Sequence, residues 1–169
     1  SLDLSGWDTS NVTNMKEMFK NCSSLTSITF GDNFDTSSVT DMTGMFQYCQ
    51  TLTDLDVSSF DTSNVTDMTE MFRNCSSLTT LDVSDWDTSK VTKMGYMFVN
   101  CYVLSGIDMS SWCVSGFDSA DYPHWDGTYN WDNRDLTYQT PISSENLPVW
   151  GTCPGSQGPT GDGHVFSTK

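Results

Sequence analysis

Basic residues are scarce in this sequence: seven Lys and Arg are set against 22 Asp and Glu, a formal net charge of -15 at pH 7. This deficit argues against binding to a phosphate backbone, so we expect no nucleic-acid partner. It favours solubility, a basic partner or bound cations. The chain also has no run of about 18 apolar residues that could cross a bilayer, so we expect no membrane span in these 169 residues.

An initiator Met and a signal segment are missing as well, since the chain begins SLDLSGW. We interpret it as a mature fragment cut from a longer soluble protein. Histidine is limited to His124 and His164, and no nucleophile motif, phosphate loop or metal-ligand pair on a helix is present. We therefore expect a non-catalytic protein rather than an enzyme.

The sequence does contain an internal repeat with a spacing of 27 residues once and then 26. Periods of this length are typical of stacked repeats, in which each unit buries its apolar face against its neighbours. We expect four full units and a partial fifth over residues 1–115. The repeated aromatic residues are Trp7, Phe34, Phe60, Trp86 and Trp112, and the repeated cysteines are Cys22, Cys49, Cys75 and Cys101.

Within each unit the apolar pattern changes its period. Ile28 and Phe30 alternate with polar residues, as in a half-buried strand, and the pattern recurs at residues 55–57, 81–83 and 107–109. Val12, Met15, Met18, Phe19 and Cys22 recur at spacings of three and four, which predicts one face of a short helix. Each unit is therefore predicted to be strand, turn, short helix, turn.

The units share the pattern W-D-T-S-x-V-T-x-M-x-x-M-F-x-x-C-x-x-L-T-x-L-D. This pattern resembles the 26-residue repeats of BspA-like bacterial surface proteins, a branch of the leucine-rich-repeat superfamily. Unit 2 departs from it with GDNFDTSSV and one extra residue. The resemblance implies an α/β solenoid of right-handed leucine-rich-repeat-like coils, with short parallel strands, short helices and an irregular C-terminal cap. It also implies a protein that is secreted or anchored at the cell surface, as such proteins typically are. Some of them act as adhesins, and similar repeats occur in viral and phage proteins.

The column of four cysteines does not suit a zinc site. Equivalent residues of stacked units lie about 4.8 Å apart on a line, whereas zinc needs ligands that converge on a tetrahedron. We expect buried, reduced cysteines with a packing role. Cys113 and Cys153 lie outside the column, where the repeat ends, and we predict a disulfide between them. A disulfide would require an oxidising compartment.

Three aspartates, Asp56, Asp82 and Asp108, fall in the strand positions between inward residues, in line with Asp3 and Thr29. Like charges at such spacing repel. A Ca²⁺ ion, raised carboxylate pKa values or a cationic ligand could offset the repulsion, and the other interpretation is a solvated acidic face. A second column, Asp8, Asp35, Asp61 and Asp87, is interpreted as acceptors in Asx turns.

Composition changes after residue 115. Residues 116–154 are rich in aromatic and turn-forming residues, which predicts a cap over the last unit. The alternative is a binding loop whose aromatic faces stack on sugar. Residues 155–169 are rich in glycine and predict a linker or tail. The aromatic candidates are Tyr122, Trp125, Tyr129 and Trp131.

Two functions from different classes follow. The first is an extracellular or surface-exposed interaction and adhesion module, which binds a protein or glycan through the strand face or the aromatic tail. The second is a structural component of a larger assembly, such as a virion fibre or surface appendage, in which the partners are neighbouring subunits. We expect no cofactor for either function apart from the candidate Ca²⁺ ion.

Overall fold

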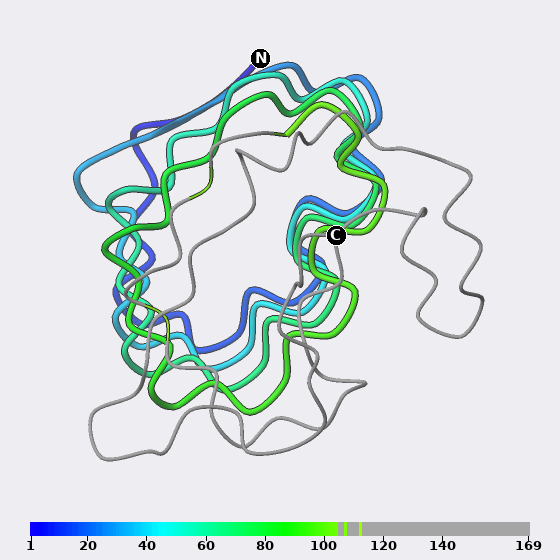
Figure 1. Ribbon diagram of the computed structural model, residues 1–169. Coiled ribbons are helices and arrows are strands. Elements are labelled where there is room, and N and C mark those ends of the chain that lie inside the picture. The colour runs from blue at the N-terminus through cyan, green and yellow to red at the C-terminus, as the bar shows by residue number, and fades with distance from the viewer. Residues whose placement is uncertain (105–106, 108–111, 113–169) are drawn as a thin grey trace, which may run out of the picture.

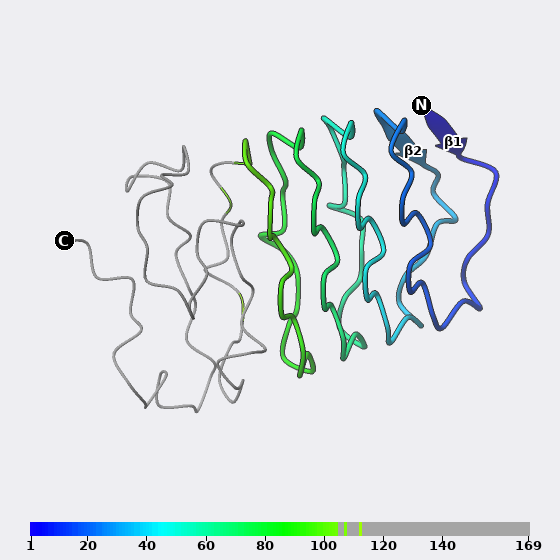
Figure 2. The ribbon, with the colours of Figure 1, turned by 90° about the vertical axis from the view of Figure 1, so that its right-hand side faces the viewer.

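A computed structural model describes residues 1–104, 107 and 112, and the account below is limited to them. The chain winds through coils of like shape that superimpose when viewed along the stack (Figure 1) and lie side by side in the perpendicular view (Figure 2). We number the coils from their repeated aromatic residue. Coil 1 is residues 7–33, coil 2 is 34–59, coil 3 is 60–85, and coil 4 begins at residue 86.

Two short strands pair at the start of the stack. Strand β1 (Leu2–Leu4) lies parallel to β2 (Ile28–Phe30), with Leu2 opposite Ile28 and Leu4 opposite Phe30. At residues 55–57 and 81–83 the inward and outward alternation continues without a strand assignment, since the outer two residues of each set are buried and the central aspartate is exposed. Farther along each coil, isolated parallel bridges join Asn14 to Asp41, Asp41 to Asp67 and Asp67 to Lys93.

The predicted short helices are not present in the described part of the chain, where turns occupy these segments. The spacing of buried residues was predicted well, because Val39, Met42, Met45, Phe46 and Cys49 are all fully buried. The backbone of these segments, however, is not helical. In coil 1, Glu17 and Asn21 have φ values of 57° and 62°, and residues in the left-handed region interrupt a right-handed helix.

Hydrogen bonding between coils explains why turns replace a helix. Alternate amides of coil 1 donate to carbonyl oxygens of coil 2, including Met15 N to Asp41 O at 2.9 Å and Phe19 N to Met45 O at 2.8 Å. The amides between them close tight turns, as in Met18 N to Met15 O at 3.2 Å. A helix would use these amides internally. The turns instead leave every second amide for the neighbouring coil.

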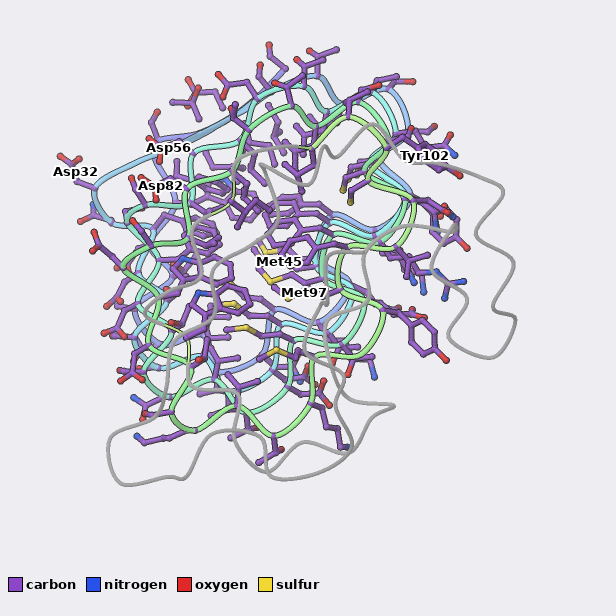
Figure 3. All side chains as sticks on the ribbon, in the orientation of Figure 1. Asp32, Met45, Asp56, Asp82, Met97 and Tyr102 are labelled. Carbon is purple, nitrogen blue, oxygen red and sulfur yellow. The ribbon has the colours of Figure 1, made fainter. Side chains whose placement is uncertain are left out.

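The core is a set of side-chain columns along the stack. Phe19, Phe46, Phe72 and Phe98 stack with ring centroids 5.4, 5.6 and 5.7 Å apart. The repeated methionines fill the same interior, where Met45 and Met97 lie in Figure 3. Each coil thus buries its apolar side chains mainly against the next coil, as stacked repeats do.

The extra residue of unit 2 forms a bulge at residues 31–33, between β2 and the repeated aromatic of coil 2. Its first residue, Gly31, lies directly against the chain that enters coil 1: a Cβ there would be 2.3 Å from the backbone oxygen of Ser5. Glycine is needed for this close approach. Phe30 and Phe34 lie before and after the bulge and pack against each other, with ring centroids 4.5 Å apart.

Candidate interaction surface

The acidic column on the strand face consists of exposed aspartates held by local hydrogen bonds. Asp56 Oδ1 accepts hydrogen bonds from Ser58 N at 3.0 Å and from Ser58 Oγ at 2.6 Å. Asp82 Oδ1 accepts in the same way from Ser84 N at 3.1 Å and Ser84 Oγ at 2.7 Å. Each of these turns fixes the carboxylate in one orientation on the surface of its coil.

These hydrogen bonds favour the charged form of the aspartates. The Ser58 hydroxyl and then its backbone amide lower the pKa of Asp56 below the usual 3.8. The pKa of Asp3 is lowered in the same direction, mainly by the backbone amide of Ser5. Serine donors two residues downstream therefore stabilise the negative charge, and the raised pKa considered from the sequence does not occur at Asp3 or Asp56.

The candidate Ca²⁺ site stays a prediction. Asp108 lies outside the described residues, so the column is described only as far as Asp56 and Asp82. Within the part of the chain that is described, no group of three or more His, Cys, Asp or Glu side chains converges as metal ligands would.

The second aspartate column forms the predicted Asx turns. The side chains of these aspartates accept a hydrogen bond from the backbone amide two residues on, at 2.8 to 3.0 Å. The threonine that follows each aspartate is buried and points to the next coil, as in Thr9 Oγ1 to Asp35 O at 2.8 Å and Thr36 Oγ1 to Asp61 O at 2.9 Å. These repeated polar residues are thus used in turns and in coil-to-coil bonds.

A cavity of about 780 Å³ opens beside the bulge at residues 31–33. Its wall includes residues of β2, among them Phe30, and residues of the neighbouring coils. Asp32 and Asp56 line it and lie on the same side of the molecule as Asp82 (Figure 3). The carboxylates that line the cavity belong to Asp8, Asp32, Asp35 and Asp56.

Asp56 was a candidate from the sequence. The sequence analysis did not predict that Asp32 and Phe30 line a cavity together with it. The feature of the sequence that could have indicated the cavity was the extra residue of unit 2. An insertion in an otherwise regular repeat marks a place where the surface changes shape, much as a bulge re-aims side chains in a sheet.

Exposed tyrosines give another part of the surface a different chemistry, and Tyr102 lies on the side of the stack away from Asp32 (Figure 3). Tyr96 is 48 % exposed and Tyr102 is 45 % exposed. The guanidinium of Arg73 lies over the Tyr96 ring, 5.8 Å from its centroid, and forms an ion pair with Glu70. Sequence reasoning did not select these residues, because their positions carry different residue types from coil to coil.

The remaining candidates lie outside the described residues. They are the proposed disulfide partners and the aromatic residues of the tail: Cys113, Cys153, Tyr122, Trp125, Tyr129 and Trp131. The predictions made for them stand as predictions.

Comparison with known families places this repeat in a larger group. The model of the family described as "Mycoplasma protein of unknown function, DUF285" matches residues 1–31 and 27–130. The chain belongs to this family. No curated protein and no solved structure shows a significant match to this chain.

The two DUF285 matches together cover the coils described above and continue through residue 130. They therefore include the segment with Tyr122, Trp125 and Tyr129, beyond the predicted end of the repeats at residue 115. The family description assigns no activity. Among the described residues no helix is long and apolar enough to span a membrane.

Proposed function

We propose that this chain is a non-catalytic interaction module, exposed outside the cell or at its surface, that binds a protein or glycan through the strand face of coils 1 to 3. The observation that carries the proposal is the acidic cavity at the bulge. It combines the carboxylates of Asp32 and Asp56 with the ring of Phe30 at the one place where the described repeat gains a residue.

The chemistry of this hollow suits a partner with a basic group. Asp56 is charged at neutral pH, and its hydrogen bonds with Ser58 lower its pKa further below the usual 3.8. Its Oδ1 is engaged by Ser58, whereas Oδ2 accepts no hydrogen bond from the described residues. Lysine, arginine or an amino sugar on the partner would meet negative charge and an aromatic ring together. The net charge of -15 extends the attraction over a longer range at low salt.

The architecture supports the same role. We propose that the coils form a solenoid of the leucine-rich-repeat kind, a proposal supported by their side-by-side stacking (Figure 2) and by a repeat pattern that resembles that of BspA-like surface proteins. In such a scaffold the repeated residues form the core and the variable residues form the surface. Adhesion to a host or to neighbouring cells is the role that this resemblance favours.

The test begins with binding of the labelled chain to arrays of glycans and to a panel of extracellular matrix proteins. The partner found is then titrated against the double variant Asp32→Asn and Asp56→Asn. At position 56 asparagine keeps an oxygen that can accept the hydrogen bond from Ser58, and at both positions it removes the charge. We expect binding at least about tenfold weaker, equivalent to about 1.4 kcal/mol, and a weaker dependence of the affinity on salt concentration.

The matched control is Asp67→Asn, on another stretch of coil 3. Asp67 also accepts a backbone hydrogen bond, from Thr69 N at 3.0 Å, but does not line the cavity. Its substitution should leave binding unchanged. Equal binding by the double variant would overturn the assignment of the surface. A chain that binds none of the partners but forms regular polymers in electron micrographs would favour the structural role instead.

A further inference from the structure

One residue in the wall of the acidic cavity departs from the repeat. Phe30 ends β2 at a position whose equivalents are completely buried: the exposed fraction is 1 % for Leu4, 0 % for Val57 and 1 % for Val83. Phe30 is only partly buried. Leu4 lies opposite Phe30 in β1, and Val57 holds the same position in the next coil. The exposure of Phe30 therefore belongs to the inside of the stack and not to one of its ends.

Phe30 is held in place by an aromatic cluster. Its ring is tilted against that of Phe34, with centroids 4.5 Å apart, and meets the ring of Phe60 in an edge arrangement at 5.2 Å. Both of these partners are buried. Phe30 and Phe34 also line the cavity. The cavity thus has an aromatic wall that is anchored in the core.

The rest of the wall is rich in hydrogen-bond acceptors. Coil 1 contributes Asp8 and Asp32, coil 2 contributes Asp35 and Asp56, and no Lys or Arg is among the described residues that line the cavity. Asp32 accepts no hydrogen bond from the described part of the chain. The negative charges also act on one another, because Ser37 lowers the pKa of Asp35 and the nearby Asp8 opposes this shift. A cation in the cavity would relieve that repulsion.

A guanidinium group matches this combination of an aromatic wall and free acceptors. It carries five N–H donors and no acceptor, and its planar face packs on aromatic rings. Its fork can also pair with a carboxylate through two hydrogen bonds. An ammonium group is a compact, strongly hydrated charge without such a face. The hydroxyl groups of an amino sugar are acceptors as well as donors, and carboxylates cannot donate to them.

We propose that the cavity receives an arginine side chain of a partner protein and that Phe30 is the residue that selects arginine over lysine and over an amino sugar. This inference rests on the proposed interaction function and narrows its partner from a protein or glycan to a protein with an exposed arginine. The net charge of -15 draws a basic segment of that protein towards the cavity.

The test compares three fluorescent probes that each carry three positive charges. They are a capped peptide with three arginines spaced by glycines, the same peptide with lysines, and a glucosamine trimer. Anisotropy titrations at about pH 6 and about 0.15 M salt keep the amines protonated and weaken long-range attraction. We expect the arginine peptide to bind at least about tenfold more tightly than either of the other probes.

Variants of Phe30 then identify the selecting residue. Phe30→Val introduces the residue found at positions 57 and 83 and removes the ring, so the preference for arginine should fall at least about fivefold. Phe30→Tyr keeps the ring and should keep the preference. The ratio of affinities is the readout, because a damaged fold would weaken all three probes alike. Circular dichroism checks the fold, and the comparison of probes on the unaltered chain does not depend on either variant.

The double variant Asp32→Asn and Asp56→Asn separates this inference from the proposed function. It should weaken the binding of all three probes. Equal affinities for the three probes, or an unchanged preference in Phe30→Val, would overturn the assignment of arginine and Phe30, while weakening by the double variant would still support the acidic surface. Binding that the double variant leaves unchanged, or no binding of any probe, would overturn both.

Discussion

At the scale of single residues, the repeated cysteines act as small buried donors. Cys49, Cys75 and Cys101 each donate a hydrogen bond to the carbonyl oxygen of a phenylalanine in the preceding coil, at 3.1 to 3.2 Å. They are buried, reduced thiols, as the sequence had predicted. Burial raises the pKa of Cys75, so its thiol stays protonated and unreactive.

Replacement of Cys75 by alanine should lower the free energy of unfolding by about 1 to 3 kcal/mol, because it removes a buried hydrogen bond and leaves a small cavity. The control is Cys22→Ala. Cys22 is only partly buried, and the described residues offer its thiol no acceptor, so the loss should be below about 1 kcal/mol. Urea denaturation of both variants measures the difference. Equal losses would contradict the assigned role of the thiol bond.

Stability should fall at alkaline pH. Burial, together with the nearby Cys22, raises the pKa of Cys49 from 9.0 to about 12. The unfolded thiol therefore ionises first, and its contribution is complete below pH 9 and is lost as the pH rises towards 12. The free energy of unfolding, measured between about pH 8 and pH 10.5, should decline less steeply in Cys49→Ala. Parallel curves for the two proteins would refute this account.

At the scale of elements, the sequence predicted which residues face the core but not the backbone that carries them. A spacing of three and four is shared by a helix and by successive tight turns, since each closes after about three residues. The two structures differ in the hydrogen-bond partner of alternate amides, and in this chain that partner lies 25 or 26 residues away. The left-handed positions were only partly visible in the sequence. Asparagine and glycine favour positive φ and occupy positions 21, 74, 100 and 44, whereas Glu17, Tyr48 and Glu70 do not favour it.

The candidate site was predictable in part for a similar reason. The column position of Asp56 followed from the repeat alone. The cavity depends on the bulge at residues 31–33, and its shape comes from how the neighbouring coils pack on either side of it. An insertion is visible in the sequence, but the hollow it makes is a property of several coils together.

Gly31 gives a direct test of the bulge. A Cβ at this position would overlap the backbone of Ser5, so Gly31→Ala should cost about 2 kcal/mol or more and disturb the pairing of β1 with β2. Gly6→Ala is the matched control, because a Cβ there meets no atom of the described residues within 4 Å. Denaturation and amide chemical shifts of residues 2–4 report the effect. A tolerated Gly31→Ala would mean that the coils are not in close contact here.

At the scale of the whole molecule, stability comes from contacts between neighbouring coils. Each repeat of such a stack contacts only its neighbours, so the whole stack is held together by the interfaces between adjacent coils. The aromatic columns illustrate this, because Phe72 stacks on Phe46, Phe98 and Trp86. Phe19, in the first coil, stacks on Phe46. A residue in the middle of the stack is therefore held from both sides.

Position in the stack should accordingly set the cost of a core substitution. We expect Phe72→Ala to lower the free energy of unfolding by about 3 to 5 kcal/mol. Phe19→Ala should cost at least about 1 kcal/mol less, because it loses fewer aromatic pairs. Both variants can be compared by urea denaturation at one pH. A greater loss for Phe19→Ala would contradict a stack in which neighbours supply the stability.

The most direct measurement of the stacked coils is the detection of scalar couplings through hydrogen bonds by NMR. The structure pairs Phe46 N with Met71 O at 2.9 Å and Phe72 N with Met97 O at 3.0 Å. Couplings between the Phe46 amide nitrogen and the Met71 carbonyl carbon, and between Phe72 and Met97, are the predicted result. Couplings from Phe46 to Met42, four residues earlier, would show a helix and contradict the coil-to-coil register on which the proposed surface depends.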